Sequence, residues 1–164
     1  MALFQSKQMA NPDPAAELEF LLHERVSVQW LGFLQAFSAE MQSQLTSEEY
    51  RDFLRSMGKR FGDLTPVGTH DTIEELESAL NAQWAALRWG HVKLTESGTQ
   101  LNIEHHFNPL TQALGGDVQV AGGFLEGAYE QWFRFAGADE NLRVKQSPEA
   151  STAAVTVLQF GIHA

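Results

Sequence analysis

The sequence predicts an α+β fold: N-terminal helices, a β-hairpin, a further helix and a C-terminal strand pair forming a small antiparallel sheet. Three observations predict it. Apolar residues recur every three or four positions through most of residues 15–87, which is the period of a helix. Two alternating runs meet at Ser97 and Gly98, and two more flank Pro148. Strands kept apart from a helical half are typical of the α+β class.

The chain begins with an expected mobile arm. Residues 1–13 carry Gln, Ser, Asn and Pro without periodicity, and Pro14 is placed to open a helix. From residue 15 to about residue 45 apolar side chains occupy two faces, which predicts one helix or two. Such a helix has to be buried on more than one side, in its own core or against another subunit. We therefore expect residues 14–164 to form a single oligomerising domain.

Capping-box spacings mark the next two helices. Thr46 is followed three residues on by Glu49, and this helix should end at Gly58 or Gly62. Thr72 stands at the same spacing before a glutamate and opens a helix that should end at a glycine, position 90. The apolar residues of this second helix form one stripe: Ile73, Leu76, Leu80, Trp84 and Leu87.

The second half of the chain alternates between strands and one helix. Residues 89–109 predict a hairpin closed by a proline. A glycine-rich loop should follow, and its glycines are Gly115, Gly116, Gly122 and Gly123. Aromatic residues at helical spacing then predict a helix over residues 124–137, and residues 142–147 and 151–163 predict the last two strands.

Composition excludes several classes of function. The 164 residues include 11 basic and 21 acidic side chains, a formal net charge of −10, which argues against nucleic acid and anionic membranes as main partners. There are no cysteines, so no disulfide, thiol nucleophile or thiolate metal site is expected. We recognise neither an export signal nor a stretch of about 18–20 apolar residues that would span a bilayer. A cytoplasmic location is therefore expected over a periplasmic one.

Histidines and carboxylates are the candidate groups for catalysis and metal binding in this sequence. His105 and His106 are adjacent in a predicted strand and should point to opposite faces, so they cannot share a metal, although one of them could still pair with His91 of the neighbouring strand. We expect at most one buried, hydrogen-bonded histidine. The acidic pairs at positions 48–49 and 74–75 stand where helices start, where the helix dipole favours carboxylates. We predict no catalytic, cofactor-binding or metal site.

The segment MGKRFG, residues 57–62, contains glycines and a lysine but lacks the GxxxxGK spacing of a phosphate loop. It also follows a predicted helix, whereas a phosphate loop precedes one. We expect Lys59 and Arg60 to complement the dipole at a helix C-terminus rather than to bind an anion.

The sequence is rich in aromatic side chains, and no predicted catalytic or metal site accounts for them. We predict that Trp84, Trp89 and Trp132 form a core junction between a helix and a strand, while Trp30, Phe33 and Phe37 form a candidate oligomer interface. Flat aromatic faces suit both subunit contact and stacking on sugar rings, and the residues alone leave both alternatives open.

Several motifs are similar, in order and spacing, to the cellulose synthase operon protein D family of cellulose-secreting bacteria. They are FLQAFS (33–38), MGKRFG (57–62), TIEELESALNAQWAALRWGHVKL (72–94), NIEHHF (102–107) and FLEGAYEQWF (124–133). The resemblance runs from about Phe33 to the C-terminus. Residues 1 to about 30 have no counterpart in the family's shorter N-terminus, so residues that contact glucan are not transferred by position.

The resemblance implies a non-catalytic accessory subunit of bacterial cellulose synthesis. It implies an octameric ring, a tetramer of dimers, whose inner passages can hold β-1,4-glucan chains and which helps pack them into crystalline ribbons. Other cellulose synthase subunits or a scaffold protein are the implied partners. The alternatives are a scaffold that binds only proteins and a glycan-processing enzyme, which would need two carboxylates about 5–10 Å apart in a cleft.

Overall fold

A computed structural model describes residues 14–24 and 26–163, and the predicted N-terminal arm lies outside these ranges. The described chain is α+β, as the sequence predicts. Its elements are α1 (Pro14–Glu24), α2 (Val28–Gln44), α3 (Ser47–Leu64), α4 (Ile73–Leu87), β1 (His91–Ser97), β2 (Gln100–His106), α5 (Leu110–Ala113), α6 (Val118–Phe135), β3 (Arg143–Gln146), a short 3-10 turn (Pro148–Ala150) and β4 (Val155–Gly161). The long N-terminal helical run is thus two helices, and Pro14 opens the first.

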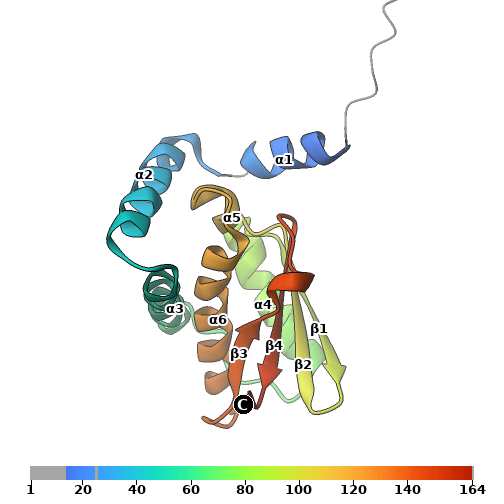
Figure 1. The fold of residues 1–164 in the computed structure, drawn as a ribbon. Coiled ribbons are helices and arrows are strands. Elements are labelled where there is room, and N and C mark those ends of the chain that lie inside the picture. The colour runs from blue at the N-terminus through green and yellow to red at the C-terminus, as the bar shows by residue number, and fades with distance from the viewer. Residues whose placement is uncertain (1–13, 25, 164) are drawn as a thin grey trace, which may run out of the picture.

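The four strands form one antiparallel sheet in the order β1-β2-β4-β3. The predicted hairpin is β1 and β2, joined at Gly98 and Thr99. Figure 1 shows α6 between α3 and the sheet, while α1 and α2 extend away from this body. Because α6 has α3 on one side and strands on the other, every residue from Val120 to Glu130 is buried.

Glycines bring the backbones of α3 and α6 into contact. A Cβ atom added at Gly58 would lie 2.0 Å from the Phe124 carbonyl oxygen, and one at Gly127 would lie 2.0 Å from the Arg55 carbonyl oxygen. The helix end predicted at Gly58 or Gly62 is therefore wrong, since both lie inside α3. The predicted loop is also wrong at positions 122 and 123, which lie inside α6. A glycine exposed to solvent destabilises a helix, whereas these glycines lie at the contact between α3 and α6 and allow the two helices to pack closely.

The caps of the middle helices follow the predicted spacings in part. At α3 the capping box is complete, because Thr46 N–H donates to Glu49 Oε2 at 2.8 Å and Glu49 N–H donates to the Thr46 side chain at 3.3 Å. At α4, Glu75 N–H donates to Thr72, but the Glu75 carboxylate accepts from Asp71 N–H instead. The last residue of this helix is Leu87, and Arg88 caps it in the left-handed conformation. The cap therefore lies two residues before Gly90, where the sequence predicts it.

A buried ion-pair network joins α3 to α6. Glu130 is fully buried and lies 2.6 Å from Arg55, 3.1 Å from Lys59 and 3.2 Å from Arg134. Burial alone would raise the pKa of Glu130, but the hydrogen bonds and charges of Arg55 and Lys59 outweigh it and lower this pKa. The expected role of Lys59 at a helix C-terminus is wrong, because α3 continues to Leu64 and turns this lysine toward α6.

Helix side chains cover part of the free edge of each outer strand. At β1, the Asn81 amide donates to Val92 C=O at 2.9 Å and accepts from Val92 N–H at 2.7 Å, and Glu77 accepts from Leu94 N–H at 2.7 Å. At β3, Glu126 and Glu130 of α6 accept from the N–H groups of residues 146 and 144. Unpaired edge groups invite strand addition from other chains, and these bonds remove most of them.

Replacing Asn81 with alanine is expected to lower the free energy of unfolding by about 1–2 kcal/mol, because the N–H and C=O of the buried Val92 lose their partners. Urea denaturation measures the loss, and hydrogen exchange at the Val92 amide should accelerate. Asn81→Asp is the matched control: it keeps an acceptor for the Val92 N–H and should protect that amide better than alanine does. Equal protection in both variants would contradict this role of Asn81.

Candidate functional site

The polar groups considered for chemistry have structural partners. His105 is fully buried, as expected of one histidine, while His106 on the opposite face stacks on His91 at 4.7 Å between ring centroids. The acidic pairs at positions 48–49 and 74–75 lie in the first turns of α3 and α4. Across residues 14–24 and 26–163 no three histidine or carboxylate side chains are grouped to hold a metal ion. No helix in these ranges is both long and apolar enough to cross a bilayer.

The three tryptophans of the predicted junction lie in one aromatic cluster. Trp84 and Trp132 are fully buried with ring centroids 5.0 Å apart, and Trp89, half-buried, stacks on Trp84 at 5.7 Å. Phe61 of α3 stacks nearly parallel to Trp84 and Trp89, at 5.9 and 6.0 Å. The end of α4 and the start of β1 are therefore packed against α3 and α6 by ring contacts.

A chain of hydrogen bonds crosses the same cluster. Trp84 Nε1–H donates to Tyr129 Oη at 3.0 Å, Tyr129 O–H donates to His105 Nδ1 at 2.8 Å, and His105 Nε2–H donates to the Trp89 carbonyl at 2.7 Å. These directions require a neutral His105 with its proton on Nε2. Burial lowers the pKa of His105 to about 4, with a smaller contribution from the nearby His91 and His106. These hydrogen bonds thus have a structural role, because they tie β2 and α6 to α4 and to Trp89 in the link between α4 and β1.

The sequence alone did not reveal Tyr129 as the centre of this chain. Its partners lie 24 and 45 residues away in the sequence, so no local spacing connects them. The ion-pair network, in contrast, had a usable signal. Arg51, Arg55 and Lys59 recur every four residues in one helix, and Glu126 and Glu130 recur at the same interval in another. Matched spacings of opposite charge indicate two facing helices.

The candidate oligomer interface lies on α2 and is largely uncovered. Trp30 is 58% and Phe33 62% exposed, and their rings meet edge to face at 6.0 Å. Phe37 differs, because it is half-buried and faces Phe53 of α3 at 6.4 Å. We define the N-terminal aromatic surface by its exposed large apolar residues: Phe20, Leu21, Val28, Trp30 and Phe33.

This surface is uncovered because α1 and α2 contact the body at few points. Ser38 Oγ donates to the Leu114 carbonyl at 2.8 Å, and Met41 and Leu45 pack against the core. Residues 26–39 contain no charged side chain, although the whole chain has a net charge of −10. Figure 1 shows the two helices reaching beyond the rest of the fold. An exposed apolar surface of this kind, uncharged along the part that α2 contributes, is typical of a contact site for another molecule.

Known proteins match most of the chain. The profile of the family described as the cellulose synthase D subunit matches residues 16–161. Proteins named cellulose synthase operon protein D from Komagataeibacter xylinus and Komagataeibacter sucrofermentans are each 33% identical over 106 residues. These matches cover 61% of this chain and 66% of the relatives, just under two thirds of their length. Because the family profile accounts for nearly the whole sequence, the chain belongs to the family of the cellulose synthase D subunit.

Proposed function

We propose that this chain is a non-catalytic accessory subunit of bacterial cellulose synthesis. It forms a ring-shaped oligomer, an octamer built as a tetramer of dimers, and helps organise synthase complexes and glucan chains into crystalline ribbons. Family membership supports the cellulose role, since the relatives carry the name cellulose synthase operon protein D. The compartment proposed is the cytoplasm, with the periplasm as the alternative, and cell fractionation tests it.

The N-terminal aromatic surface is the observation that supports assembly. Val28 is 86% exposed, and Trp30 and Phe33 are more than half exposed on a helix without charged neighbours from residue 26 to residue 39. Burying apolar area is favourable by about 25 cal/mol per Å², so covering these side chains with a second copy stabilises an oligomer. Isologous contact between two such helices would generate a dimer, the first step toward a closed ring.

A non-catalytic role is supported by how the carboxylates of the core are used. Glu126 and Glu130 are the buried carboxylates of the described chain, and both are occupied by ion pairs and by N–H groups of β3. A glycosidase needs one carboxylic acid and one carboxylate facing a sugar, and these two face α3 and the sheet. Glucan contact instead fits the flat rings of Trp30 and Phe33, provided that the subunit contact leaves one face of these rings open. The alternative is a protein-only scaffold without glucan contact.

Light scattering of the purified protein, followed by titration with cello-oligosaccharides, tests the proposal. An octamer is expected, and its tryptophan fluorescence should change with sugar if the subunit contact leaves one face of the Trp30 ring open, because Trp84 and Trp132 are buried in the core. The variant Trp30→Phe tests whether Trp30 is the source of the fluorescence change, because the change should then disappear. An octamer indifferent to sugar would favour the protein-only scaffold, and a monomer at all concentrations would refute the ring.

Phe33→Asp is expected to dissociate the oligomer while leaving the fold intact, because it places a charge on the N-terminal aromatic surface at a side chain that is 62% exposed. Light scattering measures the mass and circular dichroism the fold. Gln35→Asp is the matched control, since residue 35 is exposed and lies about 200° around the helix from residue 33. An intact octamer of Phe33→Asp would contradict this interface.

A further inference from the structure

The free edge of β1 is covered over only part of its length. Val92 and Leu94 turn their N–H groups away from β2, where Asn81 and Glu77 accept them. Because alternate residues of an antiparallel strand present their main-chain groups to the same edge, Glu96 also faces outward. No described side chain bonds the Glu96 N–H or C=O, whereas α4 covers the two preceding outward positions. The edge is open at the end nearest the hairpin turn.

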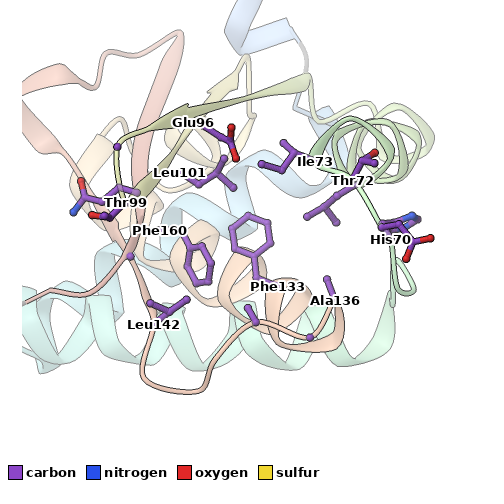
Figure 2. Close-up of a pocket in the computed structure, with 17 residues that line it drawn as sticks. His70, Thr72, Ile73, Glu96, Thr99, Leu101, Phe133, Ala136, Leu142 and Phe160 are labelled. Carbon is purple, nitrogen blue, oxygen red and sulfur yellow. The ribbon is translucent and has the colours of Figure 1, made fainter.

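A groove runs beside this open edge. One part, of about 530 Å³, lies between residues 71–74 at the start of α4 and residues 93–96 of β1. A second part, of about 470 Å³, shares Asp71, Thr72, Ile73 and Glu96 with the first, so the two parts adjoin. Figure 2 shows residues that line this second part, among them Glu96, Thr72 and His70.

The second part of the groove has an apolar floor. The rings of Phe133 and Phe160 point toward its centre, as Figure 2 shows, with their centroids 4.7 Å apart. Ile73, Leu101 and Leu142 complete the apolar lining. Such a floor at the end of the core accommodates an apolar side chain that arrives from outside.

The walls of the groove carry an excess of negative charge. Asp71, Glu74 and Glu96 are exposed, and none of them forms an ion pair within the described ranges. Lys93 is the basic residue that lines the groove, and it already lies 3.3 Å from Glu77. Self-pairing of two β1 edges would bring like charges together, so the groove favours a basic segment over a second copy.

We propose that this groove binds an extended, basic peptide segment of a partner protein by strand addition. The segment forms main-chain hydrogen bonds with the Leu94 carbonyl and with the N–H and C=O of Glu96, since the Leu94 N–H is already held by Glu77. It places Lys or Arg side chains against the three carboxylates and inserts an apolar side chain above Phe133 and Phe160. This site lies apart from the N-terminal aromatic surface, so it does not depend on the proposed ring.

Selection of a random linear peptide display library on the full-length protein tests the site. Enriched peptides should combine Lys or Arg with a nearby apolar residue, and their synthetic forms should shift the amide resonances of residues 94–97. The variant E96K should bind them about tenfold more weakly, because it replaces an attraction with a repulsion. E149K makes the same charge change in the exposed turn before β4 and should bind within about twofold of the original protein.

Main-chain pairing has its own readout. Methylating single amides along an enriched peptide should abolish binding at alternate positions only, because one edge of the peptide faces β1. Peptides that bind E96K and the original protein equally, a library without enrichment, or resonance shifts confined to α1 and α2 would each overturn the proposal. So would shifts of residues 94–97 that grow with protein concentration alone, because a second copy would then occupy the groove. Melting curves verify the fold of E96K, and E96Q replaces it if the reversal unfolds the chain.

Discussion

Trp84→Ala is expected to lower the free energy of unfolding by about 3–5 kcal/mol, the range for removing a large buried aromatic ring. Trp84 has no exposed surface and contacts the rings of Phe61, Trp89 and Trp132. The variant also leaves the Tyr129 hydroxyl without its donor. Urea denaturation at a fixed protein concentration measures the loss, since assembly contributes to the apparent stability.

Two further variants separate the causes of that loss. Trp84→Phe keeps a ring but removes the Nε1–H donor, and it should fall between alanine and the original residue. Leu64→Ala removes an apolar side chain that is 74% exposed and should change the free energy of unfolding by no more than about 0.5 kcal/mol. A Trp84→Ala protein as stable as the Leu64→Ala protein would refute the role of Trp84 in the core.

Stability should fall steeply as the pH drops from about 6.5 to about 4. The pKa of His105 is lowered from 6.5 to about 4 in the folded state, so the unfolded chain binds a proton in this window that the folded chain excludes. The stabilisation is therefore complete above pH 6.5 and lost toward pH 4, a change of about 3 kcal/mol. Because the pKa of Glu130 is lowered from 4.5, its contribution is lost on further acidification, in the same direction.

Urea midpoints at pH 7, 6, 5 and 4.5 measure this dependence. His105→Gln should be less stable at pH 7, because it interrupts the hydrogen-bond chain, but its stability should vary less between pH 7 and pH 5. His163→Gln is the control, since His163 lies near the C-terminus and bonds only the Gln159 carbonyl, at 3.2 Å. Equal pH dependence of the original and His105→Gln proteins would show that His105 does not titrate as described.

Local signals in the sequence were sufficient for much of the fold. Thr46 and Glu49 mark the start of α3 because a capping box is complete within four residues. The hairpin was predictable for the same reason, since Gly98 lies between two runs with a period of two. A single buried histidine was predictable from the pair at positions 105 and 106, because alternation in a strand leaves only one of two adjacent side chains facing the core, and the structure shows that it is His105.

Features that depend on distant partners were not predictable in this way. Gly58 ends no helix because residue 124, which lies 66 positions later, packs against it. Glu130 is buried and charged because three cations surround it, two of them from α3. For the candidate interface, the sequence showed only that residues 15–45 carry more apolar side chains than one helix face can bury. Trp30 and Phe37 both belong to this apolar repeat, yet Trp30 is exposed and Phe37 is half-buried. Periodicity identifies apolar faces and does not identify what covers them.

The glycine contacts between α3 and α6 also determine where this protein can deform. The backbones of α3 and α6 are in contact at Gly58 and Gly127, so no layer of side chains separates the two helices there. We therefore expect α3 and α6 to move as one rigid body. Helices α1 and α2 have no such contact, and they join α3 through Leu45 and Thr46. We therefore expect α1 and α2 to change their position when subunits meet, while the packed pair of α3 and α6 keeps its geometry. In the proposed ring, this movement would relieve strain between subunits without loosening their cores.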